Sequence, residues 1–246
     1  MAKFYCILFD ADNTILDFDA AEGKALDETL DHFGLPKDAA TIEKYREVNS
    51  ALWASLEKGE IRREKIMAER FPRFLKAIGS EQNGAEMNRF YLDHLATHPD
   101  AVPGAAEVLG ELAEVATLAV ASNGISYVQQ QRMKDSGLGE YMEDIFVSEQ
   151  VGCEKPNRRF FETALRGLGI EQYSHVLIVG DSLESDIRGG KNAGLATCWY
   201  NPNGAALPQD APKPDFMVRQ LDELYPIIME EDELANVGNK NRKHQL

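Results

Sequence analysis

Three short apolar runs, each followed directly by polar or acidic residues, constrain the fold of this chain most strongly. They lie at residues 4–9, 115–121 and 176–179, and weaker runs occur at 145–147 and 196–200. Continuous rather than alternating hydrophobicity is typical of strands that are covered on both faces, as in a parallel sheet. Helical patterns at residues 125–138 and 158–168 separate the runs. This alternation predicts a layered α/β fold.

The stretch from residue 18 to 98 interrupts the alternation, because it contains no convincing strand. Apolar residues recur there at helical spacing in four segments, at 26–33, 42–56, 71–78 and 87–95. We therefore expect a discontinuous α/β core, residues 1–17 and 99–246, with a helical domain of residues 18–98 inserted between the first and second strands. The polar residues 239–246 are expected to form a frayed tail.

Charge and composition exclude several classes of function. The 246 residues carry a formal net charge of −15, which argues against a nucleic acid polymer as partner. No apolar run approaches the ~18–20 residues of a membrane-spanning helix, and the N-terminus does not fit a secretory signal. The cysteines, at positions 6, 153 and 198, lack metal-site spacing. We expect a cytoplasmic protein with no membrane partner, as a monomer or weak homodimer.

The end of each strong run carries reactive residues. In open α/β sheets, ligands bind at the carboxyl ends of the strands. The first run leads to Asp10 and Asp12, which an extended segment places on the same side. The second leads to the Ser-Asn-Gly of residues 122–124, a hydroxyl and backbone N–H groups that open a helix and favour an anion. The third leads into residues 180–186, with Asp181 and Asp186.

If these strand ends meet, at least three carboxylates share one pocket. Two like charges ~4 Å apart repel by about 4 kcal/mol at an effective dielectric constant of about 20. Some carboxylates would then stay protonated at neutral pH unless a cation were present. An all-oxygen ligand set with open positions suits Mg²⁺. Lys155, followed by Pro156, is the cation best placed between the second and third motifs.

Each motif alone has an ordinary structural interpretation, such as a solvated turn for Asp10 and Asp12 or a helix cap for Ser122. The order of the four motifs is the specific signal. FDADNT (9–14), SNG (122–124), KP (155–156) and GDSLESD (180–186) resemble the motifs of the haloacid dehalogenase-like hydrolase superfamily. Asn13 departs from the commonest pattern, which has glycine there, but asparagine tolerates the left-handed backbone region.

The resemblance implies a Rossmann-like parallel sheet core with an α-helical cap domain inserted between Asp12 and Ser122. It implies that Asp10 is the nucleophile that becomes an aspartyl-phosphate, and that Asp12 acts first as general acid and then as base. Asp10, Asp12 through its backbone carbonyl, and Asp181 would hold Mg²⁺, while Asp186 would orient that metal site. The residues implied in binding the phosphoryl oxygens are Ser122, Asn123 and Lys155.

Within the superfamily, the sequence resembles the YjjG-like bacterial pyrimidine 5′-nucleotidases. The similar segments are NSALW (49–53), KGEI (58–61) and residues 189–201. The resemblance implies a Mg²⁺-dependent phosphomonoester hydrolase whose substrate is a nucleoside monophosphate. Asn49 and Trp53 lie four residues apart on one helical face, so both could contact the base. Packing of Trp53 in the core of the cap is the alternative.

Other functions remain open at this point. The protein could be a phosphatase for another small metabolite such as a sugar phosphate, or a phosphomutase on the same fold. A haloacid dehalogenase is disfavoured, because that reaction needs no acid at the position of Asp12. A phospho-accepting signalling domain is disfavoured by the helical insertion and by Asp12.

Overall fold

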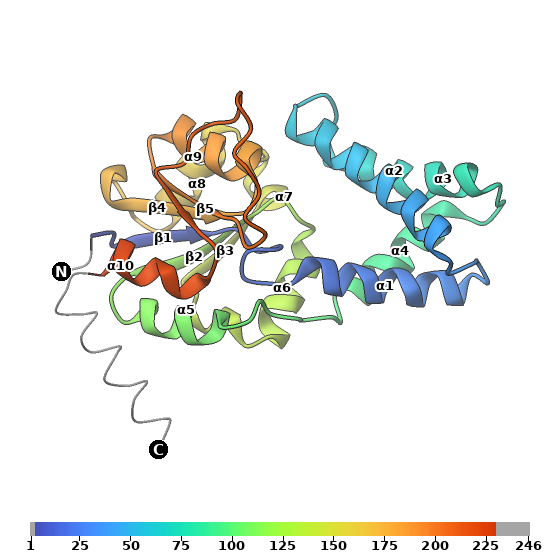
Figure 1. Ribbon diagram of the computed structural model, residues 1–246, viewed down its shortest axis with the longest axis horizontal. Coiled ribbons are helices and arrows are strands. Elements are labelled where there is room, and N and C mark those ends of the chain that lie inside the picture. The colour runs from blue at the N-terminus through green and yellow to red at the C-terminus, as the bar shows by residue number, and fades with distance from the viewer. Residues whose placement is uncertain (1–2, 230–246) are drawn as a thin grey trace, which may run out of the picture. The chain divides into compact units, whose positions relative to one another are not determined.

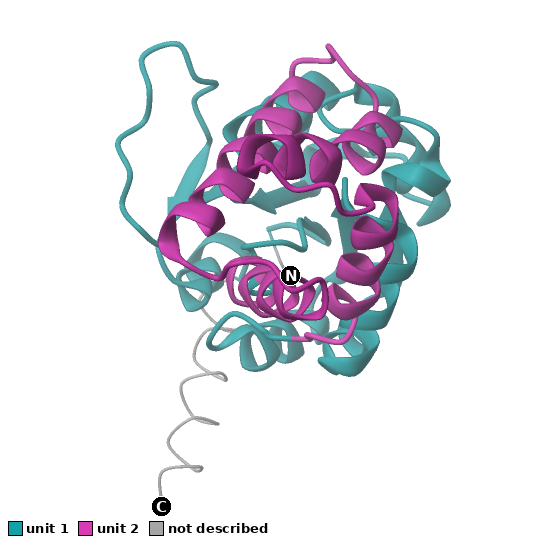
Figure 2. Cartoon of the chain, turned by 90° about the vertical axis from the view of Figure 1, so that its right-hand side faces the viewer, with its two compact units in different colours: residues 1–17, 100–246 teal, residues 18–99 magenta. Residues whose placement is uncertain are grey.

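The computed structural model describes residues 3–229 (Figure 1). The chain divides into two compact units. Phe18–Pro99 forms one of them, the helical unit, and the segments before and after it form the other, the α/β unit (Figure 2). The tail expected at 239–246 lies outside the described residues. Within residues 3–229, no helix combines the length and the apolarity that a bilayer crossing requires.

The α/β unit is built on one six-stranded sheet in which every pair of neighbouring strands is parallel. The sheet order is β3-β2-β1-β4-β5-β6. The strands are β1 Cys6–Phe9, β2 Thr117–Ser122, β3 Asp144–Val147, β4 Val176–Gly180, β5 Ala196–Tyr200 and β6 Phe216–Val218. The order is that of a Rossmann-like sheet, which confirms the predicted fold class.

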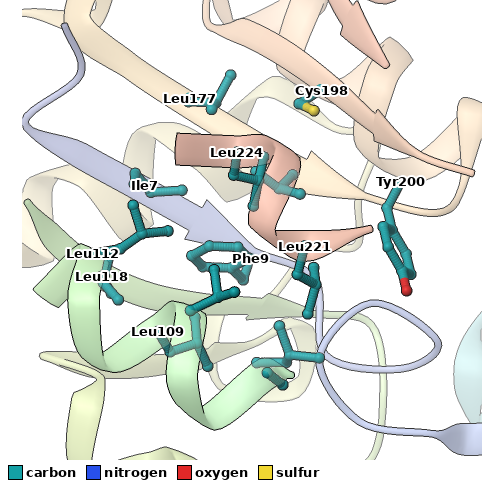
Figure 3. Packing of buried hydrophobic residues seen from close by; sticks show 14 of the residues in the cluster. Ile7, Phe9, Leu109, Leu112, Leu118, Leu177, Cys198, Tyr200, Leu221 and Leu224 are labelled. Carbon is teal, nitrogen blue, oxygen red and sulfur yellow. The ribbon is translucent and has the colours of Figure 1, made fainter. Parts of the chain in front are cut away.

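Helices cover both faces of this sheet, which explains the continuous apolar runs (Figure 1). Along β1, Ile7 and Phe9 belong to one buried cluster with Leu109 and Leu112, while Cys6 and Leu8 belong to the cluster on the opposite face. Figure 3 shows the first of these clusters. The helices of the unit are α5 Ala105–Ala113, α6 Ser126–Asp135, α7 Ser148–Val151, α8 Arg158–Gly167, α9 Arg188–Ala193 and α10 Tyr225–Ile228.

The helical unit consists of α1 Phe18–His32, α2 Ala39–Glu57, α3 Arg63–Ile78 and α4 Gly84–Leu95. Local sequence signals set the ends of these helices. The Asp38 side chain accepts a hydrogen bond from Thr41 N at the start of α2, and the Asn83 side chain caps α4 in the same way. The helices pack around buried aromatic rings of α2, α3 and α4, namely Tyr45, Phe71, Phe74 and Tyr91.

Candidate active site

The carboxyl edge of three neighbouring strands gathers the polar residues that the sequence singles out. β1 pairs with β2 on one side and β4 on the other, so Phe9 is level with Val120 and Val179. Asp10 follows β1 at once, and its backbone N–H donates to Val179 O over 2.8 Å. The strand order reverses between β1 and β4, and open α/β sheets bind their ligands at such a point.

Three carboxylates lie together at this edge. Asp10, Asp181 and Asp186 each offer one oxygen, and these oxygens lie within 4.8 Å of one another. Asp10 is 8% exposed and Asp186 is 0% exposed. Lys155 Nζ lies 2.6 Å from Asp10 Oδ1 and 2.6 Å from Asp186 Oδ1. Because Lys155 is buried as well, one ammonium group serves two buried carboxylates.

The charges of this cluster do not balance. Burial raises the pKa of Asp10 from 3.8 to about 7, with Asp186 and Asp12 adding to the rise and Lys155 opposing it. Burial, together with the charges of Asp10 and Asp186, also raises the pKa of Asp181 well above its usual range. Burial alone would lower the pKa of Lys155, but Asp10 and Asp186 raise it overall, so its ammonium group stays charged. The cluster is therefore electrostatically suited to a further cation.

The donor set fits Mg²⁺. All the ligand atoms on offer are carboxylate oxygens, which hard divalent cations prefer, and the excess of negative charge favours such an ion. Of the aspartates expected to hold metal, the structure groups Asp10, Asp181 and Asp186. It does not bring the Asp12 carboxylate into that group.

A tight turn after β4 fixes Asp186. Asp186 lies in the one-turn π-helix Leu183–Ile187, and its Oδ2 accepts a hydrogen bond over 3.1 Å from the N–H of Ser182, the N-cap residue of that helix. A Cβ atom on Gly180 would lie only 2.2 Å from Asp186 Oδ2. The glycine at the end of β4 is therefore needed for the aspartate to fold back over the strand.

Residues expected to bind phosphate lie at the end of β2. Asn123 Nδ2 donates to Lys155 O over 2.9 Å, and Lys155 N donates to Asn123 Oδ1 over 2.9 Å. This reciprocal pair ties the loop of Lys155 to the end of β2. Ser122 Oγ accepts from Gly124 N over 3.0 Å and from Gln129 Nε2 over 2.9 Å.

Asp12 is held apart from the carboxylate cluster. Arg132 Nη1 lies 2.5 Å from Asp12 Oδ1, and Gln129 Nε2 donates to Asp12 Oδ2 over 2.6 Å. Asn13 follows with φ 55°, the left-handed conformation that asparagine tolerates better than most residues. The side chains of Asp10 and Asp12, two positions apart in this turn, therefore contact different partners.

Gln129 and Arg132 were not among the site residues predicted from the sequence. Both lie on the buried face of α6, beside Val128 and Met133. A signal was present, because two polar residues three positions apart fall on the helix face that carries these apolar neighbours. We expected a helix there but assigned it no role beyond separating two strands.

The two expected substrate residues differ in their surroundings. Asn49 on α2 is 6% exposed, donates to Glu22 Oε1 over 2.8 Å and accepts from Arg70 Nη1 over 3.5 Å. Trp53, one turn later, is half-buried and packs against a cluster of α2 and α3 that contains Leu52. The Asn49 amide is therefore used within the helical unit.

Comparisons with known proteins show similarity over most of the chain. The protein YfnB of Bacillus subtilis, whose crystal structure was determined bound to magnesium, superposes with a TM-score of 0.86 at 36% identity. The match covers 91% of this chain and 98% of that one. The pyrimidine 5′-nucleotidase PynA of Streptococcus pneumoniae is 38% identical over 80% of this chain and 84% of its own.

A further relative is also similar over most of the chain. The pyrimidine 5′-nucleotidase YjjG of Escherichia coli is 34% identical over 92% of this chain and 98% of its own. A family model described as haloacid dehalogenase-like hydrolase matches residues 7–200, which include all the carboxylates of the site. The chain therefore belongs to the haloacid dehalogenase-like hydrolase family.

Proposed function

We propose that the protein is a magnesium-dependent phosphatase that hydrolyses pyrimidine nucleoside 5′-monophosphates through an aspartyl-phosphate on Asp10. One observation carries the proposal: the Asp10 carboxylate is buried at the sheet edge, held by Lys155, beside two further carboxylates, with Asp12 anchored separately. Nucleophile and acid thus have distinct partners. Two relatives named as pyrimidine 5′-nucleotidases, each similar over most of its length, support the substrate class.

In the first step, the Asp10 carboxylate attacks phosphorus and the bond from phosphorus to the ester oxygen breaks. The Asp12 carboxyl group gives its proton to the leaving oxygen, which departs as an alcohol. In the second step, Asp12 takes a proton from water while the water oxygen attacks phosphorus. The bond from phosphorus to Asp10 breaks, and inorganic phosphate leaves.

Ser122 and Lys155 hold the phosphoryl oxygens in this scheme. Ser122 Oγ accepts hydrogen bonds from Gly124 N and Gln129 Nε2. A hydroxyl has two acceptor sites and one proton, so we assign the Ser122 proton to a phosphoryl oxygen. Lys155 adds positive charge near the phosphoryl oxygens, over which negative charge spreads in the transition state. The Asn123 backbone also binds these oxygens in this scheme.

Asp10, Asp181 and Asp186 would hold Mg²⁺, with Asp186 also fixed by Lys155 and Ser182. The ion supplies positive charge that offsets the phosphoryl oxygens and the carboxylates together. The backbone carbonyl of Asp12 remains our proposed additional ligand.

Magnesium should stabilise the protein more at high pH than at low pH. In metal-free protein the folded state binds the Asp10 proton up to a pKa of about 7, whereas the unfolded chain releases it near 3.8. The free energy of unfolding therefore falls as pH rises between these values. Mg²⁺ at about 100 times its Kd should add about 2.7 kcal/mol, or roughly 5–10 °C in Tm, near pH 8, and much less near pH 5.

Thermal melts with and without Mg²⁺ at both pH values measure this effect. The Asp181→Asn variant is the control, and it should lose most of the Mg²⁺-dependent gain. An equal gain at both pH values would contradict the proposed competition between protons and metal at Asp10.

Specificity should depend on the nucleoside, because the phosphoryl group is common to all candidate substrates. We assign the helical unit as the cap domain that contacts the nucleoside, with Trp53 as the stacking residue. The burial of Asn49 against Glu22 and Arg70 supports an indirect role for Asn49, in holding α2 against its neighbours.

A phosphate-release panel tests the proposed function. With Mg²⁺, we expect dTMP, dUMP and UMP to be hydrolysed with higher kcat/KM than glucose 6-phosphate, and little release from any substrate in chelated buffer. Trp53→Ala should lower kcat/KM for the nucleotides by ~5- to 150-fold if one base-stacking contact is lost. Trp53→Phe, which keeps an aromatic face, should lose less.

The same panel distinguishes the alternatives. A preference for the sugar phosphate would make the protein a phosphatase for another metabolite. Isomerisation of a sugar phosphate with little net phosphate release would show a phosphomutase. A Trp53→Ala variant with a lower melting temperature but an unchanged substrate ranking would show that Trp53 serves the packing of the helical unit and does not contact the base.

A further inference from the structure

We propose that Gln129 and Arg132 form a clamp that positions the Asp12 carboxyl group for proton transfer. The inference rests on the proposed function, in which Asp12 gives its proton to the leaving oxygen as the bond from that oxygen to phosphorus breaks. Gln129 and Arg132 are positioning residues in this scheme, since they act on the substrate only through Asp12.

The clamp holds both oxygens of Asp12. Arg132 Nη1 is 2.5 Å from Oδ1, and Gln129 Nε2 is 2.6 Å from Oδ2. Arg132 is 0% exposed and Gln129 is 1% exposed, whereas the Asp12 side chain is 28% exposed. The fixed donors are thus buried, and the group that they hold reaches solvent. A carboxylate has about four lone-pair sites, so each oxygen keeps room for a proton.

An ion pair with a buried partner is weak evidence for a stabilising role. A buried ion pair gains about as much from Coulomb attraction as it loses in desolvation, and apolar replacements of similar size are often neutral or stabilising. Yet α6 places Arg132 and Gln129 on its buried face, next to Val128 and Met133. What the pair does provide is orientation, because a planar guanidinium group and an amide fix both direction and distance.

Gln129 also links the acid to the phosphate-binding hydroxyl. Its Nε2 lies 2.6 Å from Asp12 Oδ2 and 2.9 Å from Ser122 Oγ, so one amide group bridges the two residues. A Cβ atom on Gly124 would lie 2.7 Å from Gln129 Nε2. Gly124 therefore leaves the space in which the amide bridge sits, which gives this glycine a role in the site.

The other end of the clamp is anchored as well. Arg132 Nη2 donates to the backbone oxygen of Asp17 over 3.5 Å, and Arg132 Nη1 donates to Gln129 Oε1 over 3.4 Å. The guanidinium group thus contacts the segment after β1 at Asp12 and Asp17, and α6 at Gln129. Its orientation depends on that turn and on α6, not on Asp12 alone.

Misplacement of the Asp12 carboxyl group should slow the reaction most for substrates whose leaving oxygen must be protonated. Misplacement by ~1 Å can cost about 10²-fold in rate, and an alkoxide such as the 5′-oxygen of a nucleotide requires the proton. p-Nitrophenolate leaves with little help from an acid. A general packing defect would slow both reactions alike, so the dependence on the leaving group separates positioning from packing.

The test compares kcat/KM for dUMP and p-nitrophenyl phosphate in Arg132→Lys, Arg132→Met and Gln129→Met. We expect losses of about 10²-fold for dUMP but less than about tenfold for p-nitrophenyl phosphate. Arg132→Lys retains the positive charge, so it still tests the clamp if Arg132→Met does not fold. Lys134→Met and Gln130→Met are matched controls, because both residues are exposed on the same helix. Each should stay within about twofold of wild type, as surface substitutions usually do.

Combination with Asp12→Asn gives the second readout. If Arg132 acts through Asp12, the double variant should be about as active as Asp12→Asn alone. Equal losses for the two substrates, or fully additive losses in the double variant, would overturn the clamp. Wild-type protein that released no phosphate from either substrate would instead overturn the proposed function, so the two failures are distinguishable.

Discussion

Asp10→Asn should abolish turnover while the protein stays folded. The substitution keeps the shape of the side chain but removes the charge that attacks phosphorus, so kcat should fall by about 10⁴-fold or more, as for other catalytic nucleophiles. Folding should not suffer. Burial raises the pKa of Asp10 to about 7, so its ionisation is penalised in the folded state. A neutral amide at this position avoids the cost of burying a charge and the repulsion from Asp186.

Phosphate release in the presence of Mg²⁺ measures the effect of Asp10→Asn on activity. Thermal melts in metal-free buffer near pH 8 measure its effect on stability. Asp210→Asn, at an exposed position, is the matched control and should leave both unchanged. A well-folded Asp10→Asn protein with more than trace activity would show that Asp10 is not the nucleophile.

Lys155→Met should lower both activity and stability. The substitution leaves Asp10 and Asp186, both buried, without the ammonium group that lies 2.6 Å from each. Removing one partner from a buried ion pair costs about 3–5 kcal/mol, or a fall in Tm of roughly 6–20 °C for a chain of this size. The fall should be smaller near pH 5, where the Asp10 carboxylate, whose pKa is raised to about 7 by burial, can take up a proton.

Lys191→Met is the matched control for this stability effect. Lys191 also forms an ion pair, 3.0 Å from Asp215, but both side chains are more than one-third exposed. Such a surface pair contributes about 0–1 kcal/mol. Equal melting temperatures for Lys155→Met and Lys191→Met would contradict the assigned role of Lys155, and Lys155→Arg tests whether charge alone restores folding.

The sheet could be predicted from the sequence because its strands are buried on both faces. β1, β2 and β4 each appear as a continuous apolar run, and the parallel order follows from the helices between them. β6 was not predicted from the sequence. It is a three-residue edge strand, Phe216–Val218, and Met217 in it is 53% exposed, so it lacks the buried pattern.

The carboxylate cluster was predictable because strand ends meet at one edge of a parallel sheet. Asp10 and Asp181 could be predicted in this way, because they directly follow β1 and β4. Lys155 was predicted from its place between the second and third motifs. The clamp on Asp12 was not predictable, because its contacts join residues 117 and 120 positions apart. No local pattern specifies which buried polar residue of α6 faces which strand end.

Contacts between helices of the helical unit could not be predicted from the sequence either. Its four helices follow from apolar periodicity, but the partner of Asn49 is Glu22, 27 positions earlier on α1. Whether a polar residue in such a helix faces a ligand or another helix depends on how the helices pack. Sequence spacing alone placed Asn49 and Trp53 together, whereas the structure buries one and half-buries the other.

Trapping the aspartyl-phosphate tests the proposed mechanism most directly. The Asp12→Asn variant, mixed with p-nitrophenyl phosphate and Mg²⁺, should release about one p-nitrophenol per enzyme in a burst and then stall. Formation of the intermediate needs little acid from this substrate, whereas its hydrolysis needs the missing base. After acid quench, mass spectrometry should find one phosphoryl group on the peptide that contains Asp10, and none in Asp10→Asn. Continued phosphate release with no phosphoryl group on that peptide would contradict covalent catalysis by Asp10.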